Sequence, residues 1–379
     1  MSPNHPFVPR PALPESLQQA LADAQVPLVS LQEACASCAH LSGDIDDYPR
    51  GFDADLDTVM LGSMNSYGRQ ILISTGKSDW AREVTEEEES LAGRVKAAYG
   101  SEGGKGEAKG VGKLLGKVSK KLLGGGEKEE AEGGLQGVYP SSAVITAHEA
   151  GEQPTTAPRL SILNASFLTS SHEEGVESVM VFPDFTVVEA VPETEDGAKE
   201  LVAGYLRASV GRTGSSLPKT LRSWPLPYQA VILLCSHRKR DKRCHIAAPL
   251  LIAQFHHHLE LNGLETDELG NEIIDGPAIE DWAPETRETR LEESLKGLNV
   301  KKNGGRVGLF KVSHIGGHRY AGNAIAYFPN GSSIWYGRVT PRDVGAVVET
   351  LLAGKVIPEL LRGGLGLVGK DGPDGVLAW

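Results

Sequence analysis

The pattern of hydrophobic and polar positions predicts a chain of short strands and helices. In the N-terminal half, brief apolar runs bounded by turn residues indicate strands. They lie at 58–61, 70–74 and 179–182, and 184–191 continues the last of them. These runs define a first globular region at 26–194.

The C-terminal half carries a denser pattern of the same kind, which defines a second region at 195–362. The expected elements are strands at 231–234, 307–312, 324–328 and 333–336, and helices at 246–259, at 288–298 and from Thr340 onward. This order is typical of helices packed on a mixed sheet, as in thioredoxin-like folds. We therefore predict an α/β protein with two thioredoxin-like units, 26–194 and 195–362.

Three segments lack this pattern. Gly, Lys, Glu and Ala dominate 97–137, and such a composition buries too little apolar area to offset chain entropy, so we expect a disordered insert. Apolar residues at helical spacing within it indicate a transient linker helix, with a membrane-surface helix as the alternative. The proline-rich stretch 1–25 and the glycine-rich stretch 363–379 are expected to be flexible.

Composition narrows the partners and the compartment. The 379 residues carry a formal net charge of −12, whereas nucleic-acid binding needs a concentrated basic face. We expect proteins or small molecules as partners, no nucleic acid and no membrane contact. Only four cysteines occur, and no apolar or Arg-rich leader opens the chain. Sparse cysteines favour metal or redox roles in a reducing compartment, so a cytoplasmic protein is predicted.

The candidate chemistry lies in two short segments of the second region. One contains Cys235 and Cys244, and the other contains His314 and His318. Two thiolates and two imidazoles suit zinc, and they also suit a histidine-ligated iron-sulfur centre. By chemistry alone zinc is the better match, so both metals stay open at this point. No paired carboxylates of a glycosidase stand out, and we assign no catalytic residue.

The histidine pair flanks Gly316 and Gly317. Two glycines disfavour a helix by about 1 kcal/mol each relative to Ala. They favour a tight loop in which two imidazoles converge on a metal, and a plain hairpin is the alternative.

Basic residues fill most of the interval between the two cysteines, from Arg238 to Arg243, with Asp241 as its single acid. Cations near a thiol lower its pKa and favour the deprotonated form that binds metals. This stretch is either a solvated basic loop or a docking patch for an acidic redox partner protein.

Several motifs in serial order resemble the sucrase/ferredoxin-like family of thioredoxin-like ferredoxins. They are Gly76-Lys77-Ser78-Asp79-Trp80, Leu234-Cys235-Ser236-His237, Arg240-Asp241-Lys242-Arg243-Cys244, Ser313-His314-Ile315-Gly316-Gly317-His318, Ala321-Gly322-Asn323 and Trp335-Tyr336-Gly337-Arg338-Val339-Thr340-Pro341. The resemblance implies a C-terminal thioredoxin-like ferredoxin domain that holds a 2Fe-2S cluster. It also implies that Cys235, Cys244, His314 and His318 are the cluster ligands.

The same resemblance implies electron transfer or a redox response rather than an enzyme with its own small substrate. Imidazoles in place of two thiolates make the cluster environment less negative and raise the reduction potential. The second ring nitrogen of each imidazole can take up a proton, so reduction should couple to protonation. A structural zinc-binding scaffold is the alternative.

Two further motifs lie outside this set. Cys35 and Cys38 have the C-x-x-C spacing of thiol-disulfide oxidoreductases, which gives a second alternative function. The final Leu377-Ala378-Trp379 resembles the C-terminal tripeptide that the cytosolic iron-sulfur assembly targeting machinery recognises, with Ala378 departing from the usual acidic residue or serine. We expect Trp379 to be read by that machinery.

Overall fold

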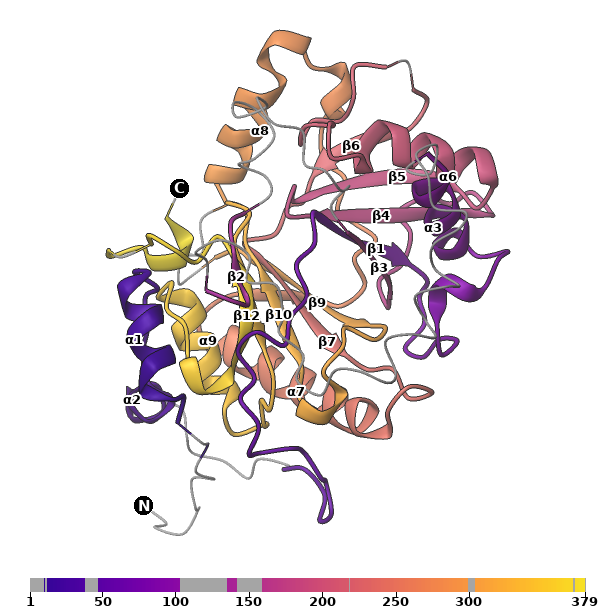
Figure 1. The fold of residues 1–379 in the computed structure, drawn as a ribbon. Coiled ribbons are helices and arrows are strands. Elements are labelled where there is room, and N and C mark those ends of the chain that lie inside the picture. The colour runs from indigo at the N-terminus through magenta and orange to yellow at the C-terminus, as the bar shows by residue number, and fades with distance from the viewer. Residues whose placement is uncertain are drawn as a thin grey trace, which may run out of the picture.

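A single twelve-stranded mixed sheet forms the centre of the described part of the protein (Figure 1). The strand order is β2-β12-β11-β10-β7-β9-β3-β1-β4-β5-β6, and β8 pairs with β9 beside this path. The computed structural model describes residues 10, 12–37, 47–102, 135–141, 159–217, 219–298, 304–370 and 372–378. The predicted α/β class is confirmed, and the arrangement is consistent with a thioredoxin-like fold.

The elements alternate along the chain much as the apolar pattern predicts. The strands are β1 (Arg69–Ser74), β2 (Val138–Tyr139), β3 (Leu160–Ala165), β4 (Val176–Phe182), β5 (Thr186–Pro192), β6 (Arg222–Pro225), β7 (Ala230–Cys235), β8 (Glu265–Asp267), β9 (Arg306–Val312), β10 (Ala324–Tyr327), β11 (Ser333–Tyr336) and β12 (Leu361–Leu365). The α-helices are α1 (Glu15–Asp23), α2 (Leu31–Ser37), α3 (Leu91–Glu102), α6 (Glu195–Leu201), α7 (Lys242–Leu261), α8 (Arg287–Lys296) and α9 (Val344–Leu352).

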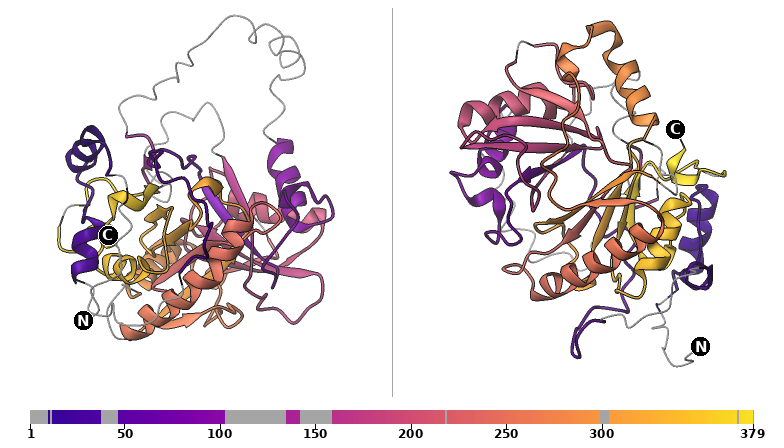
Figure 2. Two further views of the ribbon diagram at one scale, coloured as in Figure 1. Left: turned by 90° about the horizontal axis from the view of Figure 1, so that it is seen from below. Right: turned by 180° about the vertical axis from the view of Figure 1, so that it is seen from behind.

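Helices cover the sheet in separate groups. Figures 1 and 2 show α1, α2 and α9 gathered on one side of the molecule, with α3 and α6 on the opposite side. The first group and α7 share one apolar core with β7, β10 and β11, while α3 and α6 pack on β1, β4 and β5. A third core, on the other face of β7, contains Cys235 and Cys244.

The predicted boundary between 194 and 195 does not separate the strands in space. From beyond it, β6 pairs with β5 of the first region. From before it, β2 pairs with β12 of the second region. Backbone pairing across one continuous sheet therefore joins the two predicted units.

Both terminal segments predicted to be flexible are packed where the structure describes them. Leu21 of α1 and Val376 near the C-terminus are 0 % exposed. Proline at position 14 precedes the first turn of α1, and the apolar side of this helix packs on the main core. In each segment a few apolar side chains at suitable spacing pack in the core. The proline-rich and glycine-rich compositions alone did not indicate this packing.

The predicted insert and one predicted strand also differ from the structure. Residues 97–102 complete α3, and Ala98 packs in the core beside α6. The rest of the insert up to 134 lies outside the described residues. The apolar run at 58–61 is irregular rather than a strand, and Thr58 donates to the Asp55 carboxylate while its carbonyl accepts from Arg338.

Candidate metal centre

The first predicted ligand, Cys235, is the last residue of β7. Ala230 to Cys235 is a continuous apolar run, as expected for a strand covered on both faces, and all six residues are buried. The backbone N–H of Cys235 donates to the carbonyl of Asn323 on the neighbouring chain segment at 3.2 Å. The thiol is thus fixed at the edge of the sheet and only 3 % exposed.

Parallel strand pairing brings the loop from His314 to His318, the histidine loop, to the same edge of the sheet. Strands β7 and β9 run parallel, with Cys235 opposite Val312. Because parallel strands end at the same side of a sheet, His314 emerges two residues later beside Cys235. The structure places the Cys235 thiol in hydrogen-bonding contact with His314, and the backbone N–H of Ile315 also donates to that sulfur.

The helix that follows β7 carries Cys244 back to this edge. Asp241 caps α7 and accepts a hydrogen bond from the backbone N–H of Arg243 at 2.9 Å. Cys244 therefore lies in the first turn of α7. It is 1 % exposed and hydrogen-bonds with Cys235.

The two glycines shape the loop between the histidines. Gly316 and Gly317 have φ angles of 77° and 64°, in the left-handed region that favours glycine. The chain turns through them into a short 3-10 helix, His318–Tyr320. As a result the imidazole centroids of His314 and His318 lie 5.6 Å apart, at an interplanar angle of 41°.

A buried arginine that the sequence analysis did not single out braces this loop. Arg362 of β12 is 1 % exposed and donates to the carbonyl of Gly316 at 3.3 Å and to Oδ1 of Asn323 at 2.8 Å. Asn323 in turn donates from Nδ2 to the carbonyl of Gly317 at 2.9 Å. A Cβ on Gly317 would lie 2.5 Å from the guanidinium, so close approach also requires glycine here.

Charge at the site favours one thiolate in the cysteine pair. Hydrogen bonds from Cys244 and His314 hold the pKa of Cys235 well below its usual value, although burial opposes this. The Cys235 thiolate and burial then raise the pKa of Cys244. Burial lowers the pKa of Arg362 to about 10, while both sulfurs act in the opposite direction, so this cation faces the thiolate.

Contacts run through the four predicted ligands, because Cys235 touches both Cys244 and His314. The sulfurs of Cys235 and Cys244 contact one another, and the rings of His314 and His318 lie next to one another. Among the described residues, no three His, Cys, Asp or Glu side chains converge as the ligands of a single ion would. The Nδ1 atom of His314 is buried and has no hydrogen-bond partner in the described part, which leaves a donor nitrogen available to a metal.

Residues 60–363 match the family described as sucrase/ferredoxin-like. The chain belongs to the sucrase/ferredoxin-like family. The matched residues include all four members of the Cys2His2 set, so the family assignment and the site concern the same part of the molecule.

Yeast proteins are among the relatives of this chain. The chain is 38% identical over 137 residues to altered inheritance of mitochondria protein 32 of Debaryomyces hansenii, covering 35% of each chain. A protein of the same name in Candida glabrata is 26% identical over 240 residues, which is 54% of this chain and 63% of the relative. Actin patches distal protein 1 of Saccharomyces cerevisiae is 33% identical over 132 residues, 35% of this chain and 31% of its own.

The chain thus matches about a third to two thirds of the length of these relatives. No solved structure matches it. Among the described residues, no helix combines the length and apolarity needed to cross a membrane.

The other predicted motifs lie away from this centre or outside the described residues. Cys35 is half-buried on α2, which packs against α9. Cys38 and Trp379 lie outside the described residues, so the thiol-disulfide and recognition-tail predictions are not tested. Of the His256-His257-His258 run on α7, His258 is buried because it faces the core, whereas His256 and His257 are exposed.

Proposed function

We propose that this protein binds a 2Fe-2S cluster through Cys235, Cys244, His314 and His318 and serves in cytosolic electron transfer or redox response. The contacts of Cys235 with Cys244 and His314, and of the His314 ring with His318, carry the proposal. In a histidine-ligated 2Fe-2S centre two cysteines hold one iron and two histidines hold the other. A structural zinc ion would instead be held by four ligands at about 2.0–2.3 Å from one point, so metal analysis separates the two candidates.

The chain's own residues would bind and shield the group in defined ways. Cys235 and Cys244 are buried in an apolar core, which keeps water from the sulfurs. Arg362 and Asn323 hold the histidine loop. When bound, such a cluster accepts and returns one electron. His318 is exposed, so it provides the edge of the site that a partner and a proton can reach.

Charge around this exposed edge supports an acidic redox partner. Arg238, Lys239 and Lys242 are exposed, and no carboxylate within the described residues pairs with their side chains. Cationic side chains around a redox centre steer a negatively charged protein toward it. The proposal thus includes an acidic redox partner protein. It also includes recognition of Trp379 by the cytosolic iron-sulfur assembly targeting machinery.

Visible absorption and metal analysis of the full chain test the cluster. The purified protein should be red-brown and contain iron and sulfide, and Cys235→Ser, Cys244→Ser, His314→Ala and His318→Ala should each lose or strongly perturb the absorption because each removes one of four protein ligands. His256→Ala, on the exposed side of α7, is the matched control and should keep the wild-type spectrum. A colourless protein that contains zinc would establish the scaffold alternative.

Proton coupling follows from imidazole ligation. An added electron favours protonation of the outer ring nitrogen, so the reduction potential should fall as pH rises between about pH 6 and 9. Protein-film voltammetry measures this slope. Cysteine in place of His314 or His318 should lower the potential and flatten the slope, and a pH-independent wild-type potential would contradict the coupling while leaving the cluster in place.

A further inference from the structure

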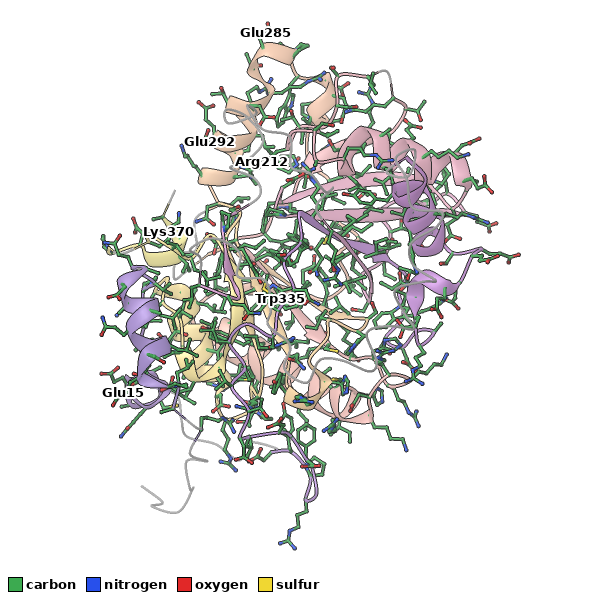
Figure 3. All side chains as sticks on the ribbon, in the orientation of Figure 1. Glu15, Arg212, Glu285, Glu292, Trp335 and Lys370 are labelled. Carbon is green, nitrogen blue, oxygen red and sulfur yellow. The ribbon has the colours of Figure 1, made fainter. Side chains whose placement is uncertain are left out.

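A cavity of about 360 Å³ opens beside the candidate metal centre. Its walls come from the start of β3, the histidine loop, the segment at 82–85 with Lys96 of α3, and Trp335 of β11. Figure 3 labels Trp335 near the middle of the molecule. The volume is at the small end of the range for ligand sites.

The cavity lies where two neighbouring strands part. β3 pairs with β1 along its whole length, from Leu160 to Ala165. With β9 it pairs only through Ala165 and Val312. After Val312 the chain turns away into the histidine loop, so no strand in the described part continues the ladder along β3.

Hydrogen bonds show which backbone groups this leaves open. The carbonyls of Arg159 and Ala165 accept from the β1 side, from the N–H groups of Gly68 and Thr75. Asn164 points the other way, since its carbonyl accepts from the Ser313 N–H at 2.8 Å. Bonding direction alternates along a strand edge.

By this alternation the N–H and C=O groups of Leu160 and Ile162 point toward the cavity. All four residues from Leu160 to Leu163 line it, although their side chains alternate between faces, so the edge of the strand forms the wall. An open strand edge is a template for an extended chain.

The charged groups around the cavity favour an anion. Arg82, Lys96 and Arg159 are its exposed cations. Glu83, the acid among the lining residues, forms an ion pair with Arg240. The lining therefore presents more positive than negative charge.

A buried imidazole nitrogen adds unpaired hydrogen-bonding capacity. His237 lines the cavity, is 1 % exposed, and its Nε2 lies 3.1 Å from the carbonyl of Trp80. Its Nδ1 is buried without a partner among the described residues. Buried polar atoms in folded proteins are usually paired, so this nitrogen favours a polar occupant.

We propose that the cavity binds a short acidic peptide in extended conformation. Its backbone would pair with the open groups of Leu160 and Ile162, and its carboxylates would contact Arg82, Lys96 and Arg159. This occupant satisfies the strand edge and the cations together, which a simple inorganic anion does not. The site goes beyond the metal proposal and does not depend on a metal being bound.

Calorimetric titration of the full chain with matched peptides tests the site. Acetyl-Glu-Ala-Glu should bind, and the neutral acetyl-Gln-Ala-Gln amide should bind at least about ten-fold more weakly, because charge-assisted hydrogen bonds are lost. Arg159→Gln should lower the affinity for the acidic peptide to a similar degree. Arg222→Gln, an exposed arginine on β6 at the far end of the sheet, is the control and should not change binding.

The strand edge is tested separately. Ile162→Pro removes an N–H that faces the cavity without removing a bond to β1, and proline is tolerated at such open edges. It should lose peptide binding and keep the wild-type melting temperature, whereas Ile162→Val should bind as wild type. If Ile162→Pro does not fold, Arg82→Gln combined with Arg159→Gln decides, and this variant should show no binding.

Four results would overturn the proposal: no binding to the wild type, equal binding of the neutral peptide, unchanged binding by folded Ile162→Pro or by the double arginine variant, or equal binding of succinate. The last result would identify a site for a small dicarboxylate instead of a peptide.

Discussion

At the scale of single residues, the cation beside the cysteine pair is the group that sequence reasoning did not find. Arg362 is buried with no carboxylate among the hydrogen-bond partners that the structure shows for it, which are Ser63, Gly316 and Asn323. An unpaired buried charge is costly unless hydrogen bonds and nearby negative charge offset it. The Cys235 thiolate and the loop carbonyls provide that compensation, so Arg362 acts as a positioning residue for the histidine loop.

Substitutions at Arg362 should separate its charge from its geometry. In the cluster-loaded protein, Arg362→Met should lower the reduction potential by on the order of 60 mV, about 1.4 kcal/mol for one electron, because a cation near the added charge is lost. It should also lower the free energy of unfolding by about 1–3 kcal/mol, since buried acceptors lose their donor.

Arg362→Lys is the matched control for this pair of effects. Lysine keeps the positive charge, so the reduction potential should stay close to the wild-type value. It lacks the guanidinium donors that bind Gly316 and Asn323, so the free energy of unfolding should still fall. Voltammetry and urea unfolding measure both quantities. An unchanged potential in Arg362→Met would contradict an electrostatic role.

At the scale of elements, the β4–β5 hairpin contains carboxyl groups that prefer to be neutral. Glu189 of β5 is 6 % exposed and hydrogen-bonded to the Ser178 hydroxyl on β4. Burial raises its pKa to about 7, and burial likewise raises the pKa of Glu177 on β4 to about 7. The folded hairpin therefore holds protons that the unfolded chain releases near pH 4.5.

Stability should consequently decline as pH rises through this window. Below pH 4.5 Glu189 is protonated in both the folded and the unfolded chain, and between 4.5 and 7 it is protonated only in the folded chain. Above pH 7 it is ionised in both, and its contribution to the free energy of unfolding is fully lost. For Glu189 alone the shift corresponds to about 3 kcal/mol. In urea unfolding between pH 4.5 and 8, Glu189→Gln should remove that part of the decline in the free energy of unfolding. Glu173→Gln, at an exposed position on the loop before β4, is the control and should show the same decline as the wild type. A wild-type slope retained in Glu189→Gln would assign the decline to other groups.

At the scale of the whole molecule, the C-terminal segment belongs to the fold. Leu367 and Val376 are 0 % exposed. Asn330 donates to the carbonyls of Val376 and Ala378, and Lys370 also donates to Ala378. The chain is thus anchored up to the residue before Trp379, so any recognition of Trp379 starts from a fixed stem.

Two changes in this segment should have different consequences. Leu367→Ala should cost about 2–5 kcal/mol of unfolding free energy by leaving a cavity. Deletion of Trp379 should leave the urea midpoint unchanged and lower the iron content per protein after expression in a eukaryotic host. Equal iron content with and without Trp379 would contradict its role as a recognition signal. If deletion of Trp379 lowered stability as much as Leu367→Ala does, Trp379 would instead be a packing residue.

The sequence by itself determined the class of fold and indicated which residues form the candidate site. Apolar runs at the periods of strands and helices predicted most elements of the second region, because local periodicity reflects which face is buried. Serial motifs indicated the family, and Cys235, Cys244, His314 and His318 stood out by chemical type and short spacing.

Only the tertiary structure decided how these residues meet and what surrounds them. Parallel pairing of β7 and β9 and the start of α7 bring the two motifs to one edge, which depends on contacts about seventy residues apart. Arg362, the packed termini, the parting of β3 from β9 and the burial of Glu189 likewise depend on distant neighbours. Burial and charge partners are properties of the assembled core, so no local pattern in the chain encodes them.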